Sequence, residues 1–324
     1  MSPIADESAL PLFIILNAAS GHNNISTVCT TIEEVLIQSG RSYQMIVVED
    51  TAQLDCIACQ TVEKACECSG AVVVAGGDGS INAVAQAALG RRCPFGVLPL
   101  GTFNYFGREH GISSDPAEAV RELLSARIQS VQVGFVNDRL FLVNASLGLY
   151  PQLLEDREAF KQQYGRIRLV AFASGLVTLL RHHRQLLISL ELRGEGYDLR
   201  TPTLFVGNNR LQLEQIGIPL EKAFENDELV AIALRPIGVV AMLWLLVRGA
   251  FGELGEAGDV ISFGFKRMTV RPSRGLAPRV KVATDGEVGW MNMPLEFRVS
   301  PQPLYLLKPD TMPKSEILAT GSDA

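Results

Sequence analysis

The sequence predicts two domains of different classes: an N-terminal three-layer α/β domain and a C-terminal antiparallel β-sandwich with helical insertions. Up to about residue 126, short apolar runs alternate with stretches of helical periodicity, as in a parallel sheet covered by helices. From Val131 onward, short β-type runs follow one another with turns between them, which is typical of a sandwich. We expect the domains to span residues 11–133 and 134–309, followed by a disordered tail at 310–324.

Composition and charge restrict the class of protein. Of the 324 residues, 47% are hydrophobic and 20% are charged, which is a globular composition. The formal net charge of -6 argues against a nucleic-acid partner. No apolar run has the length of a membrane span, and the first ten residues do not resemble a signal peptide. Six cysteines in a chain of this length do not form a disulfide scaffold, so we expect free thiols and a cytoplasmic protein.

The first domain begins with two strand–helix units. Phe13–Leu16 is predicted to be a strand, and the helix after it is expected to end at Gly40. The buried face of that helix is predicted by apolar residues at helical spacing, namely Val28, Ile32, Val35 and Leu36. Tyr43–Val48 is expected to form the second strand and Thr51–Cys68 the second helix.

The stretch from Ala71 to Asn104 organises the domain. Ala71–Ala75 is rich in β-branched residues, as a strand covered on both faces would be. Three glycines within the next four residues end that strand, and Ser80 is expected to open a helix with a Gly90 cap. The apolar face of this helix is predicted to hold Ile81, Val84, Ala85, Ala88 and Leu89. Phe95–Leu98 is the next predicted strand. A helix from about Pro116 to Ala126, capped by Asp115, is expected after it.

The glycine-rich turn after Ala75 suits a polyphosphate. Its glycines permit backbone conformations that a Cβ would forbid, and the following helix presents unpaired N–H groups. Asp78 is anomalous there, because a carboxylate repels phosphate unless a cation or a donor mediates. Either Mg²⁺-nucleotide or a structural hydrogen bond from Asp78 to the second loop would explain it. A tight strand-to-helix turn is the alternative. A second loop after the next strand favours a ligand site, because ligands collect at the carboxyl ends of parallel strands.

The second domain is predicted from a series of short β-type runs. They are Val131–Val136, Leu140–Ala145, Leu186–Leu192, Thr203–Val206, Leu229–Leu234, Met268–Arg271, Val280–Ala283 and Leu295–Val299. A further run, Leu304–Leu307, is a candidate to return to the first domain. Helical insertions are expected near Pro151–Arg184 and Pro236–Ala250, and each contains an uncharged apolar run flanked by arginine. Those helices either cover the sandwich or lean on a membrane.

Two groups of potential ligand residues have structural alternatives. Cys56-x-x-Cys59 and Cys66-x-Cys68 have the spacing of a zinc site, but they fall in a predicted helix, where sulfur side chains serve as filler. His182 and His183 are interpreted as solvated helix-end residues. Asp285-Gly286-Glu287 follows a predicted strand, so by itself it is a hairpin turn.

Four segments together resemble a known family. They are, in order, Asn17-Ala18-Ala19-Ser20-Gly21, Gly76-Gly77-Asp78-Gly79-Ser80-Ile81-Asn82, Pro99-Leu100-Gly101-Thr102-Phe103-Asn104 and Asp285-Gly286-Glu287. These segments are similar to the NPxSG loop, the GGDG(T/S)xN and PxGTxN segments and the DGE triplet of the diacylglycerol kinase catalytic domain family, which includes lipid and sphingosine kinases. The resemblance covers roughly residues 12 to 309.

The resemblance implies an ATP-dependent lipid kinase with its active site in the cleft between the two domains. Glu287 would act as the general base on the lipid hydroxyl, with Asp285 as support or as a partner for Mg²⁺. The residues that would hold ATP are Asn17, Ser20, Gly21, Gly76, Gly77, Asp78, Gly79, Ser80, Asn82, Gly101, Thr102 and Asn104. Diacylglycerol is the first expectation for the substrate, and peripheral contact with the inner face of the membrane is implied.

The chain departs from the family pattern at several positions. Ala18 replaces the proline of the first loop, and no Lys or Arg follows Gly21. Bacterial relatives often hold a structural Mg²⁺ with an Asp after the PxGTxN asparagine and with a DGxLD-like segment. Here Tyr105 follows Asn104, and the second segment is Asn226-Asp227-Glu228-Leu229-Val230. We therefore expect Mg²⁺ to bind mainly with ATP, Tyr105 to fill the interdomain space, and Asp227 to be the remaining metal candidate.

Two other functions stay open. An NAD kinase shares a GGDG loop, although the PxGTxN and DGE segments favour a lipid kinase. A non-catalytic lipid- or nucleotide-binding protein on the same fold would account for the departures from the family pattern.

Overall fold

The computed structural model describes residues 10–20, 25–155, 185–192, 194–218, 226–238, 258–272 and 278–309, with single positions at 241, 244 and 248. The chain divides into two compact units, one formed by Met1–Val131 with Gln302–Ala324 and the other by Gln132–Pro301. Several predictions concern residues outside these ranges: Gly21, His182 and His183, most of both helical insertions, and the tail at 310–324.

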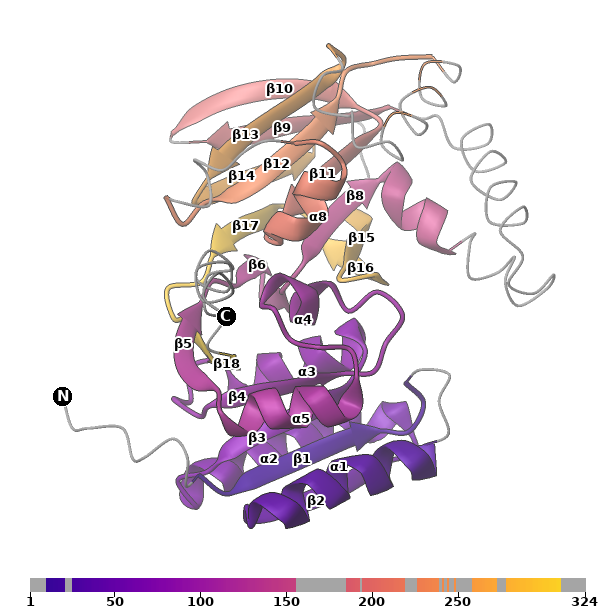
Figure 1. Cartoon of the computed structure of the whole chain (residues 1–324). Helices are drawn as coiled ribbons and strands as arrows, with labels where there is room; N and C mark the ends of the chain where they lie inside the picture. Colours follow the sequence, from indigo (N-terminus) through magenta and orange to yellow (C-terminus); the bar gives the residue numbers. More distant parts are fainter. Residues whose placement is uncertain are drawn as a thin grey trace, which may run out of the picture. The chain divides into compact units, whose positions relative to one another are not determined.

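The first unit contains a six-stranded sheet in the order β2-β1-β3-β4-β18-β5. The strands are β1 (Leu12–Asn17), β2 (Tyr43–Val48), β3 (Ala71–Gly76), β4 (Phe95–Pro99), β5 (Arg127–Val131) and β18 (Leu304–Lys308). Neighbouring strands are parallel except for β18 and β5, which are antiparallel. The last strand of the chain therefore lies in the same sheet as the first one (Figure 1).

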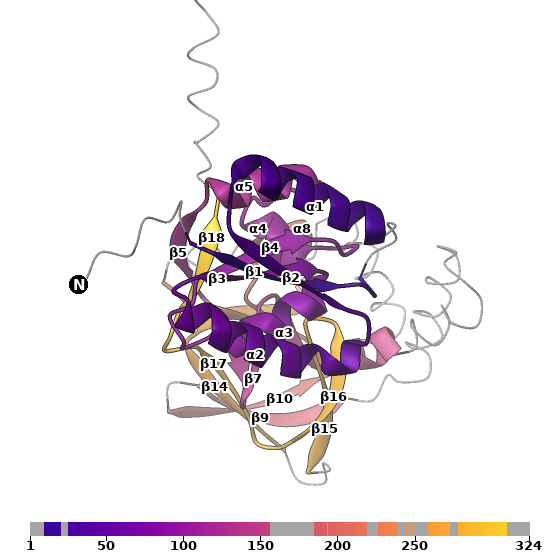
Figure 2. The same cartoon turned by 90° about the horizontal axis from the view of Figure 1, so that it is seen from below.

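Helices cover both faces of this sheet, as in a three-layer α/β fold. The helix α1 (Ile25–Ser39) packs with α5 (Pro116–Leu124), and α2 (Leu54–Glu67) packs with α3 (Asp78–Ala88). The two pairs lie on opposite sides of the strands in Figure 2. A short 3-10 turn, η2 (Thr51–Gln53), precedes α2, and α4 (Tyr105–Glu109) follows β4.

Local sequence explains most of these elements. The strands β1, β3 and β4 are buried along their whole length, as their apolar runs predict. The four predicted apolar residues of α1 are its buried residues. The predicted cap of α5 is confirmed, because the Asp115 side chain accepts a hydrogen bond from the N–H of Glu118. Three helix boundaries were wrong. The helix α3 begins at Asp78, two residues before Ser80, because Gly77 is the N-cap. The helix α2 begins at Leu54, after a 3-10 turn, and α5 ends at Leu124 and not at about Ala126.

The second unit contains two antiparallel sheets of six strands each. The first has the order β10-β9-β14-β17-β6-β7 and the second β13-β12-β11-β8-β15-β16. The strands of the first sheet are β6 (Gly134–Val136), β7 (Arg139–Phe141), β9 (Leu186–Leu192), β10 (Glu195–Thr201), β14 (Arg267–Pro272) and β17 (Leu295–Val299). Those of the second are β8 (Asn144–Gly148), β11 (Thr203–Gly207), β12 (Leu229–Leu234), β13 (Val260–Phe265), β15 (Arg279–Thr284) and β16 (Glu287–Asn292).

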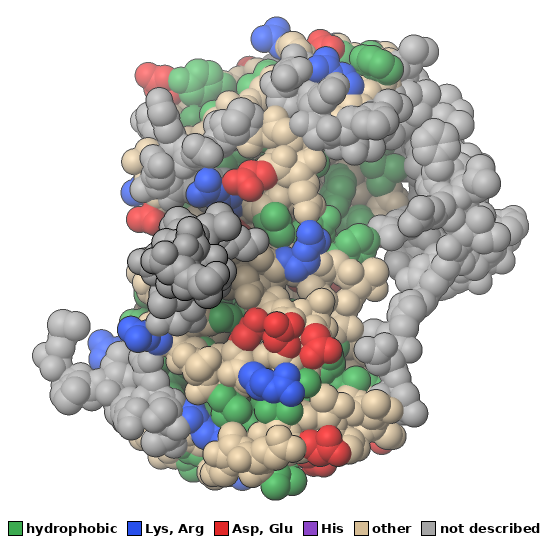
Figure 3. All heavy atoms as spheres, viewed as in Figure 1, with side chains coloured by type: hydrophobic (Ala, Val, Ile, Leu, Met, Phe, Trp, Pro, Cys, Tyr) green, Lys and Arg blue, Asp and Glu red, His purple; other side chains and the backbone are tan. Residues whose placement is uncertain are grey.

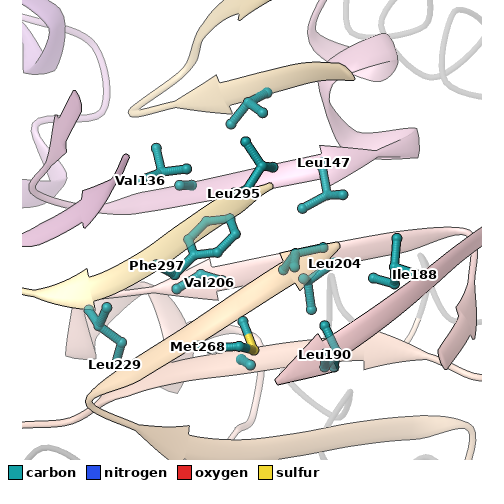
Figure 4. Packing of buried hydrophobic residues seen from close by; sticks show 14 of the residues in the cluster. Val136, Leu147, Ile188, Leu190, Leu204, Val206, Leu229, Met268, Leu295 and Phe297 are labelled. Carbon is teal, nitrogen blue, oxygen red and sulfur yellow. The ribbon is translucent and has the colours of Figure 1, made fainter. Parts of the chain in front are cut away.

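The two sheets share one hydrophobic core, which is the property that makes them a sandwich. Met268 and Phe297 come from the first sheet, and Leu147, Val206 and Leu229 from the second. Figure 4 shows side chains of both sheets meeting in this cluster. On the other face of the second sheet, Leu213 of the short helix α8 (Arg210–Gln215) packs with Val230.

Two predicted strands of the second domain were wrong. The run Val131–Val136 is divided between β5 and β6, which belong to different sheets. The run Leu140–Ala145 is divided between β7 and β8, because the N–H groups of Leu142 and Val143 bond to the Asp285 carboxylate and not to a strand. The strands β5, β10, β13 and β16 were not predicted, since each contains polar or glycine residues that break the apolar alternation.

The surface carries charges of both signs. On the face drawn in Figure 3, acidic and basic side chains of the described residues are interspersed, with no broad field of one sign. In the part of the chain that the structure describes, no helix has the length and apolar character needed to cross a membrane.

Candidate active site

The loops after β3 and β4 meet through their backbones at two glycines. A Cβ on Gly101 would lie 2.7 Å from the Cα of Gly77 and 2.8 Å from Asn104 Oδ1. A Cβ on Gly77 would lie 3.3 Å from the Cα of Gly101. The N–H of Leu100 also donates to the carbonyl of Gly76 at 2.9 Å. The two loops predicted to hold a nucleotide therefore lie together at the carboxyl ends of neighbouring parallel strands.

The reason for glycine at these positions differs from the prediction. Gly77 has φ -88° and ψ 179°, which any residue can adopt, and Gly76, Gly79 and Gly101 are not among the glycines with positive φ. The expectation that these glycines adopt forbidden backbone conformations was therefore wrong. Glycine is required because two backbones approach too closely to leave room for a Cβ.

Asp78 hydrogen-bonds to the second loop, so its carboxylate is used within the fold. The N–H groups of Tyr105 and Phe106 donate to its two oxygens, each at 3.3 Å. Burial raises the pKa of Asp78, while the neighbouring N–H groups and the charge of Arg108 act in the opposite direction. Of the two explanations offered by the sequence, the structural hydrogen bond is the one observed. The N-cap residue of α4, Asn104, makes no side-chain hydrogen bond to the start of that helix, and the Asp78 carboxylate serves as the cap instead.

Asn104 holds the second loop in shape. It is buried, has a left-handed backbone with φ 50°, and its amide closes a ring with Gly101. The N–H of Gly101 donates to Asn104 Oδ1 at 2.8 Å, and Asn104 Nδ2 donates to the Gly101 carbonyl at 2.9 Å. Between them Thr102 is exposed, and Phe103 stacks on Tyr105 with ring centroids 5.7 Å apart. Asn104 is thus a structural residue of the loop, whereas Thr102 is open to a ligand.

The first loop joins this arrangement through three polar side chains. Asn17 Nδ2 donates to Ser80 Oγ at 2.8 Å, and the hydroxyls of Ser20 and Ser80 lie 3.3 Å apart. The N–H of Gly77 donates to Ser20 Oγ at 3.4 Å. Asn82 lies one turn further along α3. Asn17, Ser20 and Ser80 therefore connect the ends of β1 and β3 at the start of α3.

The beginning of α3 has the features of an anion site. Its N-cap Gly77 makes no side-chain cap hydrogen bond, so the first N–H groups of the helix are not bonded by a cap residue. The helix dipole places partial positive charge at this end. With the glycine loops beside it, this end of the sheet can hold phosphate oxygens.

In the second unit, the Asp285 carboxylate is bound by backbone. The N–H groups of Leu142, Val143 and Asn144 donate to its two oxygens at 2.8, 2.8 and 3.0 Å. Asp285 has φ 49° and Gly286 has φ 90°, as in the tight hairpin turn that Asp-Gly favours between β15 and β16. The carboxylate therefore ties this turn to the segment between β7 and β8.

Glu287, the first residue of β16, pairs with an arginine that the sequence reasoning missed. Arg139 Nη2 donates to Glu287 Oε2 at 2.7 Å, and the glutamate side chain is 60% exposed. A Cβ on Gly289 would lie 3.6 Å from the guanidinium of Arg139, which is an ordinary van der Waals contact. The pair joins β7, an edge strand of one sheet, to β16, an edge strand of the other.

Buried amides next to the Asp285 turn were also missed. Asn208 Nδ2 donates to the Leu142 carbonyl at 2.8 Å, and Gln132 Nε2 donates to Asn208 Oδ1 at 2.9 Å. Asn144 Nδ2 donates to Gln212 Oε1 at 3.0 Å, while Asn144 Oδ1 is a buried acceptor with no partner among the described residues. The available signal was the polar pair Asn208-Asn209 directly after a strand.

Asp227 and four cysteines of the sequence were the candidate metal ligands. Asp227 is exposed in the turn before β12 and has φ 53°. Within the described ranges, no three His, Cys, Asp or Glu side chains come together as a metal site. Cys56, Cys59, Cys66 and Cys68 are exposed free thiols.

Paired glycine loops at the carboxyl ends of parallel strands in an α/β unit are a common arrangement for binding phosphate. The diacylglycerol kinase catalytic domain model matches residues 11–136. Over these residues the chain is similar to the diacylglycerol kinase catalytic domain family.

Relatives extend the similarity beyond that segment. A Pseudomonas putida protein named probable lipid kinase YegS-like is 29% identical over 248 residues, which is 75% of this chain and 78% of the relative. A Klebsiella pneumoniae protein of the same name is 30% identical over 140 residues, 42% of this chain and 46% of that protein. This chain thus spans about half the length of several curated relatives that it matches.

A solved structure described as a diacylglycerol kinase from Bacillus anthracis has a TM-score of 0.67 and covers 93% of this chain and 97% of its own. At 17% identity, this likeness shows the fold.

Proposed function

We propose that this protein is an ATP-dependent lipid kinase, which transfers the γ-phosphoryl group of ATP to the hydroxyl of a lipid such as diacylglycerol. The observation that carries the proposal is the match of residues 11–136 to the diacylglycerol kinase catalytic domain. Relatives named as probable lipid kinases support it. Because the acceptor is a membrane lipid and ATP is a cytoplasmic substrate, the reaction would take place at the inner face of the membrane.

In this proposal the first unit binds ATP. The backbone of the paired glycine loops and the first N–H groups of α3 would hold the phosphates. Gly77 and Gly101 leave the loop surface without side chains, and Ser20, Ser80 and Thr102 offer hydroxyls nearby. Asp78, Asn17 and Asn104 would act by keeping the loops in shape, since each makes hydrogen bonds within the fold.

The second unit would supply the base. The acceptor oxygen attacks the γ-phosphorus, the bond from that phosphorus to the oxygen of ADP breaks, and the hydroxyl proton passes to the Glu287 carboxylate. Arg139 orients this carboxylate through the 2.7 Å hydrogen bond. Asp285 supports the turn, since its carboxylate already accepts three N–H groups.

Mg²⁺ would neutralise charge on the ATP phosphates when it is bound. The described residues do not build a metal cage, because both oxygens of Asp78 accept N–H groups and Asp227 is exposed in a turn. We therefore propose that the metal arrives with the nucleotide.

The experiment that tests this function is incubation of the purified protein with γ-labelled ATP and a panel of lipids, beside NAD. Label in an organic-phase product from diacylglycerol or another lipid alcohol supports the proposal. Label transferred to NAD would make the protein an NAD kinase. ATP binding by calorimetry without transfer to any acceptor would make it a non-catalytic binding protein on this fold.

A further inference from the structure

We propose that the outward face of the β15–β16 hairpin binds an anionic lipid bilayer, with Trp290 at the level of the headgroups and Arg279 beside the lipid phosphates. The choice of a bilayer as partner rests on the proposed lipid kinase function.

Trp290 is exposed at the edge of a sheet. Its side chain is 58% exposed, and β16 is the last strand of the sheet in which it lies. Side chains alternate between the two faces of a strand. Its neighbour Met291 packs against the core of the sandwich, so Trp290 points to the outward face. A large aromatic side chain in this position makes no contribution to the shared core.

Two cations lie against the indole. Lys281 is the direct partner of Trp290 in the β15–β16 register, and its Nζ lies 5.5 Å from the ring centroid. The guanidinium of Arg279, two residues earlier on β15, lies 5.9 Å from the same ring. Lys281 is paired with Glu155, its Nζ lying 2.6 and 2.8 Å from the two carboxylate oxygens, so Arg279 supplies the net positive charge of this face.

This combination fits the interfacial region of a bilayer. An indole has an apolar body and a polar N–H, and tryptophan is favoured at the boundary between hydrocarbon and water. The arginine beside it is attracted by the negative potential of anionic lipids. A purely ionic partner would offer the indole no apolar contact. A purely apolar partner would remove the arginine from water without giving it an opposite charge.

The hairpin also carries the proposed base. Glu287 and Trp290 are three residues apart on β16, which is about 10 Å along a strand. Because the separation is odd, their side chains leave the strand on opposite faces. Docking of Trp290 among the headgroups would hold Glu287 within about 10 Å of the depth at which a lipid hydroxyl lies.

The test uses fluorescence, because the chain contains only two tryptophans. In a Trp244→Phe background, Trp290 is the sole emitter. Phosphatidylglycerol mixed into phosphatidylcholine vesicles should shift its emission to the blue and protect it from an aqueous quencher, whereas phosphatidylcholine alone should have a smaller effect. In co-sedimentation with the mixed vesicles, Trp290→Ala should weaken partitioning on the order of tenfold and Arg279→Gln about fivefold.

Tyr197→Ala is the matched control. Tyr197 is 49% exposed on β10, an edge strand of the other sheet, and its hydroxyl bonds to Glu195. This variant should sediment with vesicles as the parent does. Equal partitioning of the parent, Trp290→Ala and Arg279→Gln would overturn the proposal. Loss of self-association in lipid-free Trp290→Ala would also overturn it, because the face would then be a contact between copies.

Activity separates this inference from the proposed function. If the inference holds, Trp290→Ala should keep the parent rate on a water-soluble short-chain diacylglycerol and lose rate on diacylglycerol in anionic vesicles. If the protein phosphorylates no lipid but still needs Trp290 to bind vesicles, the kinase proposal fails and the bilayer site stands. If it phosphorylates soluble diacylglycerol while Trp290→Ala binds vesicles normally, the kinase proposal stands and the bilayer site fails.

Discussion

Arg139 and Glu287 form an ion pair 2.7 Å long between the edge strands of the two sandwich sheets. Both side chains are substantially exposed, so the pair contributes little to stability, and its effect is to orient the carboxylate. An exposed glutamate directly after a rigid turn can reach a substrate, whereas Asp285, held by three N–H groups, cannot turn to one.

Glu287→Gln should lower turnover on the order of 10²–10⁴-fold and leave ATP affinity and melting temperature unchanged. The amide keeps the shape of the side chain but cannot accept the hydroxyl proton. Glu191→Gln is the control, because Glu191 is in a comparable exposed pair with Arg271, 2.9 Å long, in the same unit. Near-normal turnover of Glu287→Gln would remove this residue from the role of base.

Substitutions at the paired glycines should weaken ATP binding in a graded way. Gly101→Ala places its Cβ 2.7 Å from the Cα of Gly77 and should be more damaging than Gly77→Ala, where the closest approach is 3.3 Å. Valine at either position should abolish binding measured by calorimetry. Gly196→Ala is the control, since a Cβ there meets nothing within 4 Å. Unchanged ATP affinity in both valine variants would mean that these loops connect strand to helix but do not contact the nucleotide.

Asp285→Asn should destabilise the protein by about 1–3 kcal/mol. Asparagine tolerates the left-handed backbone, but its amide nitrogen would replace one oxygen that now accepts an N–H group. Asp227→Asn is the matched control, because Asp227 also has positive φ but is exposed in a turn. Urea unfolding measures both. Equal stability of the two variants would show that the hydrogen bonds of Asp285 do not hold the turn.

His110→Phe should reduce the loss of stability at acid pH. Burial, together with the charge of Lys308, lowers the pKa of His110 from 6.5 to about 3. At a pH between these two values the unfolded chain therefore binds one more proton than the folded protein. The free energy of unfolding is not reduced by this group above pH 6.5, and it falls by up to about 1.4 kcal/mol per pH unit as the pH approaches 3.

Phenylalanine keeps the packing of this ring against Phe106, whose centroid is 4.6 Å away, and cannot be protonated. Urea unfolding between about pH 7 and about pH 4 measures the difference between the two proteins. Parallel stability curves would show that His110 does not titrate in this way.

Mg²⁺ without nucleotide should not raise the melting temperature of the protein at millimolar concentration. A hard cation needs several oxygen ligands, and in the described ranges no three carboxylates or other ligand side chains gather. Differential scanning calorimetry with and without ATP measures the effect. A rise in the absence of ATP that Asp227→Ala abolishes would show a structural metal site.

The local pattern of the sequence was sufficient for most of the α/β elements, although not for β5 or α4. The strand β2 begins and ends where its apolar run does, and the buried residues of α1 are the predicted ones. Asp115 before Pro116 predicted the start of α5 correctly, because a cap acts on N–H groups within three residues of itself. The four segments that are proposed to bind the nucleotide or to act in catalysis were also found from sequence. The roles of their residues stay predictions.

Tertiary structure alone decided which distant groups meet. The insertion of β18 between β4 and β5, the contact of Gly77 with Gly101, and the binding of Asp285 to Leu142 join residues far apart in the chain. None of these has a local signal, because periodicity and capping report only on neighbours along the chain. The sequence by itself determined most of the α/β elements and many strands of the sandwich. Only the tertiary structure showed why glycine is needed in the loops and that the Asp285 carboxylate is held by three backbone N–H groups, whereas Glu287 is an exposed partner of Arg139.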